Sequence, residues 1–315
     1  MTERLVVVWR VTTRCNLSCG FCAYDRALSF ARRDADEATA AALGQALTAE
    51  KRRTGHEVHV SFLGGEPWLW PHLPRVARDF RTRGLSLGVT TNGTGLNQPG
   101  AVALLQECFD ELTVSLDGLQ ETHDRLRAWP GGHARILAAL ASVLERRGPN
   151  LRVRVNTVLM RDNVDEFAEL CRTLARLGVD ELSFNRLGGR DRPEFFAEHR
   201  LSAGELARVF SELDALRREL PSMRILGSAE YRQRLLALER GERAVVEDCR
   251  PGQSFLFVDE RGQVAPCSFT TSEYGEPVRD MAQLPALFST RQLLGRARSC
   301  DDCQSTHVFG KFRGA

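Results

Sequence analysis

Lysine is almost absent from this sequence: it occurs only at Lys51 and Lys311, and arginine supplies nearly all the positive charge. The two signs nearly cancel, because 43 Lys and Arg stand against 41 Asp and Glu, which gives a net charge of +2. So balanced a chain lacks the basic excess typical of nucleic-acid-binding proteins, and no appended basic domain is visible. We therefore do not expect a nucleic-acid partner.

Long apolar runs are also missing. No stretch approaches the roughly 20 apolar residues of a transmembrane helix, and the N-terminus lacks the apolar core of a secretory signal. We expect a cytoplasmic protein with no membrane partner. In that reducing compartment, the nine cysteines are more plausibly metal ligands than disulfides. With 315 residues and no internal repeat, the chain is long enough for one large domain and a smaller one.

Three cysteines stand in one short loop, in the pattern Cys-x-x-x-Cys-x-x-Cys at Cys15, Cys19 and Cys22. The loop follows the apolar run 5–11, which predicts a buried strand. Thiolates so close in sequence can converge on one metal centre at little entropic cost. A four-iron cluster needs four ligands, so three thiolates leave one iron open to another molecule. A zinc knuckle, or a chance grouping of cysteines, is the alternative.

Strand-like and helix-like segments alternate through the first two thirds of the chain. The expected strands are 5–11, 57–62, 85–90, 111–116, 151–159 and 181–185, and the expected helices are 34–51, 73–83, 101–108, 133–147 and 164–177. Six such units in series predict a parallel sheet with right-handed crossovers. The candidate motifs follow strand ends, where α/β barrels build their active sites. Periodicity alone does not separate a partial barrel from an open doubly wound sheet.

Two further motifs follow expected strands. In Gly64-Gly65-Glu66-Pro67 the glycines let the backbone approach a ligand closely, and Glu66 offers an acceptor for an ammonium group, although a strand-to-helix turn would look the same. The other motif is Ser115-Leu116-Asp117-Gly118, followed by His123, Asp124 and Arg127. An arginine can pair with a carboxylate through two parallel hydrogen bonds.

Together these motifs resemble those of the radical S-adenosylmethionine (radical SAM) superfamily, in which an aromatic residue, here Phe21, precedes the third cysteine of the loop. The resemblance implies an α/β fold built as a partial (β/α)6 barrel. It also implies a [4Fe–4S] cluster on Cys15, Cys19 and Cys22 whose open iron binds S-adenosylmethionine (SAM). In that family an electron, supplied by a donor such as flavodoxin or ferredoxin, cleaves SAM to a 5′-deoxyadenosyl radical that abstracts a substrate hydrogen.

The resemblance also assigns residues to the SAM site. In this family the Gly-Gly-Glu-Pro motif binds the methionine amino group, and sulfatase-maturating and peptide-modifying members hold the SAM carboxylate with a serine and an arginine after the fourth strand. The SAM contacts implied for this chain are Tyr24, Gly64, Gly65, Glu66, Asn92, Ser115 and Arg127. We expect His123 and Asp124 to fix the loop rather than to catalyse. The catalytic acid or base is not identified; Asn185 and Arg186 are pocket-lining candidates.

A second cysteine group lies near the C-terminus, at Cys249, Cys267, Cys300 and Cys303. Residues 255–259, a turn at Gly262 and residues 263–265 predict a β-hairpin that carries Cys267, and residues 291–298 predict a short helix before the last pair. Four thiolates make a closed ligand set, fit for a second iron–sulfur cluster or for zinc. The isolated Cys108 and Cys171 are expected in the core, with return of a hydrogen atom to the substrate as the alternative for Cys108.

The C-terminal segment resembles the opening of the SPASM/twitch extension, which implies an auxiliary [4Fe–4S] cluster on Cys249, Cys267, Cys300 and Cys303. Only 12 residues follow Cys303, without the further cysteines of a full SPASM domain, so we expect the shorter twitch form. The expected division is a barrel over residues 1–200, a helical connector over 201–245 and an auxiliary-cluster domain over 246–315.

The sequence leaves two classes of substrate, a small molecule and a peptide. Because the auxiliary site resembles that of 2-deoxy-scyllo-inosamine dehydrogenase, our main prediction is oxidation of a small molecule, such as a sugar, cyclitol or amino-acid-like compound, in natural-product biosynthesis. The alternative is maturation of a ribosomally made peptide by crosslinking, epimerisation or oxidation, and since only 14 residues precede Cys15, we would then expect a separate leader-binding protein. The complete cysteine loop and Gly-Gly-Glu-Pro argue against a zinc-stabilised binding module and against a fold that has lost its chemistry.

Overall fold

The computed structural model describes residues 4–242, 252–278 and 281–294. Within them a single sheet runs in the order β10-β9-β8-β1-β2-β3-β4-β5-β6-β7. The strands are β1 (Arg4–Thr12), β2 (Glu57–Gly64), β3 (Ser86–Thr91), β4 (Glu111–Ser115), β5 (Arg152–Leu159), β6 (Glu181–Arg186), β7 (Arg224–Ile225), β8 (Phe255–Val258), β9 (Gln263–Ala265) and β10 (Glu276–Pro277). All neighbours from β8 to β7 are parallel, and β9 pairs antiparallel with both β8 and β10.

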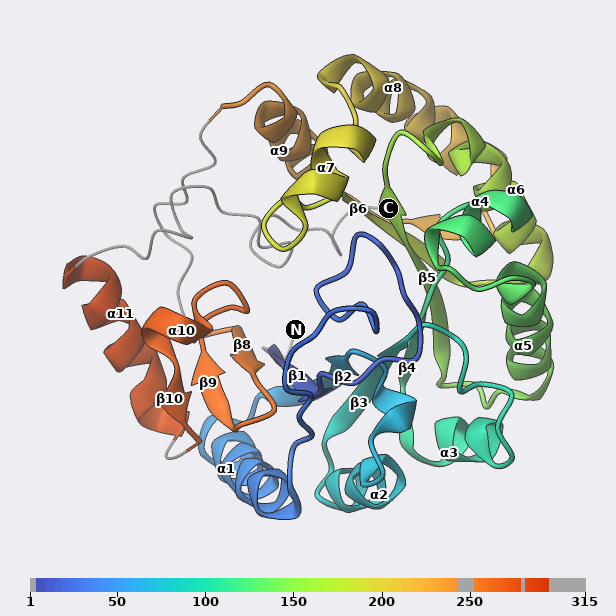
Figure 1. The fold of residues 1–315 in the computed structure, drawn as a ribbon. Coiled ribbons are helices and arrows are strands. Elements are labelled where there is room, and N and C mark those ends of the chain that lie inside the picture. The colour runs from blue at the N-terminus through green and yellow to red at the C-terminus, as the bar shows by residue number, and fades with distance from the viewer. Residues whose placement is uncertain (1–3, 243–251, 279–280, 295–315) are drawn as a thin grey trace.

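Most of the helices lie on the outer side of this sheet, which curves around a mouth crossed by the loop that follows β1 (Figure 1). The helices are α1 (Glu37–Thr54), α2 (Leu73–Thr82), α3 (Ala101–Cys108), α4 (Gln120–Leu126), α5 (Gly132–Arg146), α6 (Phe167–Leu177), α7 (Pro193–His199), α8 (Ala203–Glu219), α9 (Ala229–Glu239), α10 (Thr271–Tyr274) and α11 (Leu284–Leu294). Helix α7 instead packs Phe195 against Phe21 of the loop. Because β7 and β10 end the sheet at opposite edges, the barrel of the described residues is partial, and the α/β prediction is confirmed.

The six expected strands agree with β1 to β6 to within two residues at either end. The helices α4 and α7 were missed, because each is only 7 residues long and shows no apolar period. The helix expected over residues 291–298 is wrong in its start: α11 begins at Leu284. None of the helices in the described part of the chain is long and apolar enough to cross a membrane.

Alternation along β1 decides which of its side chains face the helices and which face the inside of the barrel. Trp9 is fully buried on the helix side, where its ring packs against Trp70 at 5.3 Å, Phe62 at 5.7 Å and Phe80 at 5.8 Å between ring centres. Aromatic groups of this size dominate the burial of apolar surface in a core. The even-numbered residues therefore project to the inside of the barrel, and among them Arg10 lies near the mouth, close to the C-terminal end of the strand.

The N-terminal end of the barrel is closed by buried ion pairs. Arg154 of β5 lies between two carboxylates, 2.5 Å from Glu181 and 3.5 Å from Glu111. His59 stands 3.9 Å from Glu111, and burial lowers its pKa to about 4, so it is neutral at pH 7. Further arginines reach the same two carboxylates, at Arg4, Arg152 and Arg224. These charges lie at the opposite end of the strands from the cysteine loop.

The hairpin that carries Cys267 continues the barrel's own sheet. Strand β8 pairs parallel with β1 along its length, from Val6 opposite Phe255 to Trp9 opposite Val258. Its sequence, Phe-Leu-Phe-Val, is apolar on both faces, as is typical of a parallel strand covered on both sides. The sequence predicted the hairpin; its place beside β1 depends on contacts between residues about 250 apart, which a local pattern does not show.

We predict that Arg154→Met destabilises the protein, because it leaves Glu111 and Glu181 buried with fewer partners. The loss should be about 3 kcal/mol, the lower end for breaking a buried pair, since Arg152 and Arg224 still reach Glu181. Urea unfolding measures it. The matched control is Arg78→Met, which breaks the exposed pair with Glu107 and should leave the midpoint unchanged. Equal midpoints for both variants would contradict a structural role for the buried network.

Candidate active site

The cysteine loop folds back on itself at the mouth of the barrel. The amide of Cys22 donates to the carbonyl of Cys19 at 3.0 Å, which turns the chain between these two residues. A side chain missed by sequence reasoning holds the loop: the guanidinium of Arg32 donates to four of its carbonyls, those of Thr13, Tyr24, Asp25 and Leu28, at 2.6–3.1 Å. One arginine thus satisfies carbonyl groups that would be paired within a helix or a sheet if this segment had regular secondary structure.

Burial disfavours the thiolate forms of the three loop cysteines. It raises the pKa of Cys15 and Cys22, and it raises that of Cys19 to about 12, although the nearby Arg127 cation opposes it in each case. The thiols also act on one another electrostatically, so they are neighbours. Within the described residues no three His, Cys, Asp or Glu side chains converge on a point that could hold one metal ion. A set of three adjacent thiols fits a larger group in which each sulfur binds a different iron.

The two glycines of Gly64-Gly65 let the end of β2 lie directly against the start of the cysteine loop. A Cβ at Gly64 would come within 2.3 Å of the Thr12 carbonyl, and one at Gly65 within 2.1 Å of the Arg14 carbonyl. The amide of Gly65 donates to Thr12, at 2.8 Å. These glycines are therefore required by the protein's own backbone, whatever ligand they also approach.

Glu66 is fully buried and joins the ends of β2 and β3. Its carboxylate accepts from the Thr91 hydroxyl at 2.8 Å, and from the backbone amides of Asn92 at 2.7 Å and Trp68 at 3.1 Å. Burial raises its pKa to about 7, against the lowering effect of these three hydrogen bonds. This bracing role was not foreseen, and the predicted contact with a SAM ammonium stays a prediction.

Asn92 and Tyr24 both lie beside the cysteine loop. The side-chain amide of Asn92 donates to Asn16 at 3.0 Å and stands 3.7 Å from the sulfur of Cys15. The amide of Tyr24 donates to the sulfur of Cys22 at 3.4 Å, and its hydroxyl accepts from Arg10 at 3.0 Å. The structure thus brings both predicted SAM contacts to the cysteines, and their contact with SAM stays a prediction.

Arg10 connects this loop with the C-terminal hairpin. Its Nε donates to Glu260 at 2.7 Å, while Nη1 donates to Tyr24 and the ring of Phe257 lies 5.5 Å away. The Glu260 side chain is 5% exposed, so the pair is largely shielded from water. The sequence signal for this contact was a charged residue, Arg10, within the apolar run 5–11. We did not use it to predict a partner for Arg10.

We predict strong coupling between Arg10 and Glu260. In a double-mutant cycle with Arg10→Met and Glu260→Gln, the interaction energy from urea unfolding should be about 1–3 kcal/mol, as for residues in direct buried contact. A parallel cycle on the exposed Arg14 and Asp34 should give less than about 1 kcal/mol. Additive effects at Arg10 and Glu260 would show that the hairpin does not depend on this contact.

The end of β4 lies on the other side of the loop. It carries Ser115, and Asp117 and Arg127 come after it. Arg127 is buried, its Nε donates to Asp117 Oδ2 at 2.6 Å, and its Nη1 stands 4.0 Å from the sulfur of Cys19. Ser115 is the last residue of β4, and its hydroxyl has no hydrogen-bond partner in the described part of the chain. Both residues lie near the cysteines, and their predicted contact with a SAM carboxylate stays a prediction.

His123 and Asp124 fix the surrounding backbone, in agreement with the expectation. The fully buried ring of His123 accepts from the Asp117 amide at 3.1 Å, and burial lowers its pKa to about 2, so the ring is neutral. Asp124 accepts from the amides of Gly131 and His133 at the start of α5. The pocket candidates Asn185 and Arg186 are held by α9, through Tyr231 at 3.2 Å and Glu239 at 2.9 Å.

The second cysteine group lies mostly outside the described residues, which include Cys267 but not Cys249, Cys300 or Cys303. Cys267 is half-buried after β9, with its sulfur 3.5 Å from the hydroxyl of Thr270. Cys108 and Cys171 are 1% and 0% exposed and belong to the main core, as expected.

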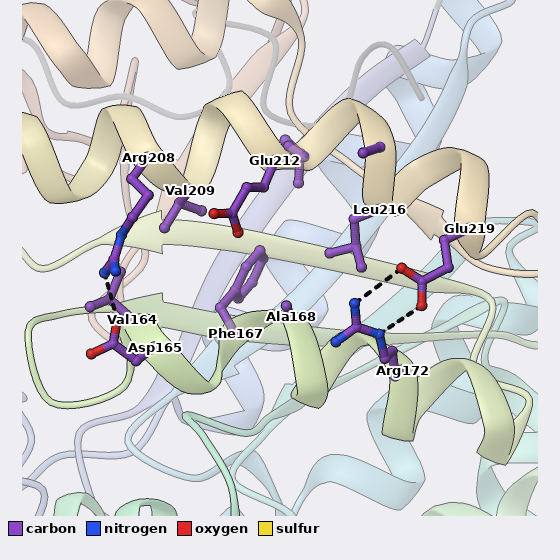
Figure 2. Close-up of a pocket in the computed structure, with 12 residues that line it drawn as sticks. Val164, Asp165, Phe167, Ala168, Arg172, Arg208, Val209, Glu212, Leu216 and Glu219 are labelled. Carbon is purple, nitrogen blue, oxygen red and sulfur yellow. Dashed lines mark hydrogen bonds and ion pairs between the residues drawn. The ribbon is translucent and has the colours of Figure 1, made fainter.

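A crevice of about 300 Å³ lies on the outside of the barrel, between α6 and α8, away from the cysteine loop (Figure 2). Ion pairs cross it near both ends, Arg208 with Asp165 and Arg172 with Glu219, at 2.5 and 2.6 Å. The apolar side chains along it are already buried, Phe167 at 3% and Leu213 at 1% exposed. It is a gap between packed helices, and the site lies instead at the mouth of the barrel.

A profile of the radical SAM superfamily matches residues 9–190, which include the cysteine loop and the residues after β2, β3 and β4. The chain therefore belongs to the radical SAM superfamily, whose members are enzymes that use a [4Fe–4S] cluster and SAM. The three neighbouring thiols of the loop fit such a cluster.

Among curated relatives, the chain is 30% identical over 186 residues to the Fe-coproporphyrin III synthase of Methanosarcina barkeri, covering 59% of this chain and 44% of that protein. It is 23% identical to an AdoMet-dependent heme synthase of Oleidesulfovibrio alaskensis, over 98% of this chain and 82% of that one. It is 24% identical to the sporulation killing factor maturation protein SkfB of Bacillus subtilis, over 92% and 67%.

Two solved structures share the fold. SuiB of Streptococcus suis, bound to precursor peptide SuiA, gives a TM-score of 0.70 at 16% identity, over 95% of this chain and 68% of that one. The enzyme anSMEcpe, with bound AdoMet and the Cp18Cys peptide, gives 0.65 at 16% identity, over 98% and 88%. The similarity to these SPASM/twitch-type maturases extends past the barrel into the C-terminal segment.

Proposed function

We propose that this radical SAM enzyme modifies a ribosomally made peptide, by crosslinking, epimerisation or oxidation. The observation that carries the proposal is the extent of the likeness to peptide-bound SuiB and anSMEcpe, which covers nearly the whole chain. SkfB, a maturation protein by name, supports it from sequence. The small-molecule substrate that we put first from sequence is less well supported, and the alternative takes its place.

Each set of residues has its own part in the proposed reaction. Cys15, Cys19 and Cys22 would hold the cluster, which with bound SAM supplies the 5′-deoxyadenosyl radical and so the abstraction of a substrate hydrogen. The end of β2, Ser115 and Arg127 would orient SAM, and Tyr24 and Asn92 would line its site. The buried surroundings of the loop would exclude water, which keeps a reactive intermediate from side reactions.

A tetrapyrrole is the second candidate substrate. The heme synthase of Oleidesulfovibrio alaskensis aligns with 98% of this chain, more than a barrel domain alone would explain.

We also propose an auxiliary [4Fe–4S] cluster on Cys249, Cys267, Cys300 and Cys303, in a twitch-type segment over residues 246–315 after the connector 201–245. A cluster bound by four thiolates has no iron free for SAM, and it can take up the second electron of a two-electron oxidation. A flavodoxin or ferredoxin is the proposed electron donor of the first cluster. The described position of Cys267, after a hairpin whose first strand pairs with β1, supports a site beside the barrel.

We predict two clusters per chain. Protein reconstituted without oxygen should hold about eight irons, and replacing Cys15, Cys19 and Cys22 with Ala should remove about half of them. Iron and zinc analysis with absorption spectra measures both. A colourless wild type with one zinc would contradict the assignment.

A Cys300→Ala/Cys303→Ala variant should keep the first cluster and still cleave SAM, but with little oxidised product.

The substrate is tested with the reduced holoenzyme, SAM and two sets of compounds: short precursor peptides encoded beside the gene, and iron-coproporphyrin. We expect 5′-deoxyadenosine to form together with a peptide of changed mass, by liquid chromatography and mass spectrometry. The cysteine-loop triple Ala variant is the negative control. Product from iron-coproporphyrin alone would replace the peptide proposal with the tetrapyrrole one, and product from neither would reject both.

A further inference from the structure

Arg127 and Asp117 form a charge pair that is almost completely buried beside the cysteine loop. The side chain of Arg127 is 10% exposed and that of Asp117 is 0% exposed. The guanidinium donates to one carboxylate oxygen from Nε at 2.6 Å, and its Nη2 forms an ion-pair contact of 2.5 Å with the same oxygen. Two opposite charges held this closely without water interact more strongly than an exposed pair.

Three further hydrogen bonds hold Asp117 in place, one at its carboxylate and two at its backbone. The carboxylate oxygen that Arg127 does not contact accepts from the amide of Val158 in β5, at 2.7 Å. Its backbone carbonyl accepts from the Asn163 side chain at 3.0 Å, and its amide donates to His123 at 3.1 Å. Asp117 therefore cannot turn to follow Arg127, and the direction of the guanidinium is set by the carboxylate.

The remaining donors of Arg127 face the cysteines. The hydrogen bond and the ion-pair contact with Asp117 use the Nε–Nη2 edge, which leaves Nη1 on the far side, 4.0 Å from the sulfur of Cys19. The ring of Phe21 lies 5.2 Å from the guanidinium and covers it. In the described residues no other acceptor lies within hydrogen-bond distance of Nη1. The carboxylate thus aims one N–H group at a sulfur that, in this family, is a cluster ligand.

We propose that Asp117 is a positioning residue that aims Arg127 at the Cys19 sulfur, and that this pair sets the reduction potential of the SAM-binding cluster. An added electron makes the cluster more negative, so a cation and an N–H donor at its sulfur favour the reduced form. The Asp117 carboxylate opposes this effect, because its charge offsets that of Arg127. The proposal requires family membership and does not depend on which substrate the enzyme modifies.

The test is the midpoint potential of the first cluster in the full-length holoprotein, by redox titration followed by electron paramagnetic resonance. The signal of the first cluster is identified as the one that the Cys15→Ala/Cys19→Ala/Cys22→Ala variant lacks. We expect Asp117→Asn to shift the midpoint to more positive values, because Arg127 then acts uncompensated. We expect Arg127→Met to shift it to more negative values. Unchanged midpoints in both variants would overturn the proposal.

Either variant could fail to assemble the cluster, so Arg127→Lys is measured beside them. It keeps the charge but loses the fork, and we expect a more negative midpoint than in the wild type. A wild-type midpoint in Arg127→Lys would overturn the aimed contact with Cys19. The matched control is Arg125→Gln, two residues before Arg127 in the last turn of α4. Its partner Asp162 lies at 2.8 Å and its own side chain is 57% exposed, so its midpoint should equal that of the wild type.

Discussion

The direct contact between the backbones at the ends of β1 and β2 is the constraint on which the rest of the site depends. Gly64 and Gly65 lie against the carbonyls of Thr12 and Arg14, closer than any Cβ would permit. This contact fixes where the cysteine loop leaves the sheet. Glu66, the next residue, then joins the same point to β3 through Thr91 and Asn92. The loop and the neighbouring strand ends are thereby one rigid unit, as a site that must position reacting groups requires.

The inside of the barrel is polar at both ends, and arginine supplies the cations in both. At the N-terminal end, Arg154 lies between Glu111 and Glu181. At the mouth, Arg10 and Arg127 each contact a buried carboxylate and a second group near the cysteines. The planar guanidinium can use one edge for a carboxylate and another for a different partner, which a lysine ammonium does less specifically. The scarcity of lysine thus has a structural counterpart in this interior.

The C-terminal segment is more closely integrated with the barrel than a separate appended domain would be. Strand β8 extends the parallel sheet beside β1, and Arg10 holds Glu260 in the turn that follows. A group bound near Cys267 would therefore be held in a fixed relation to the first cysteine loop. The same continuity explains why the likeness to peptide maturases extends over nearly the whole chain.

Local pattern was enough to predict the six barrel strands, the cysteine loop and the superfamily, because these depend on residue spacing within short segments. Cys15, Cys19 and Cys22 lie in one turn-rich loop, and the glycines of Gly64-Gly65 are needed wherever two backbones meet. The partners of Arg10, Glu66 and Arg127 were not predictable in this way. Each is a charged residue whose contact lies far along the chain, at Glu260, Asn92 and Cys19. Only the tertiary structure decides these contacts, because burial forces a charge to find whichever partner the fold brings near.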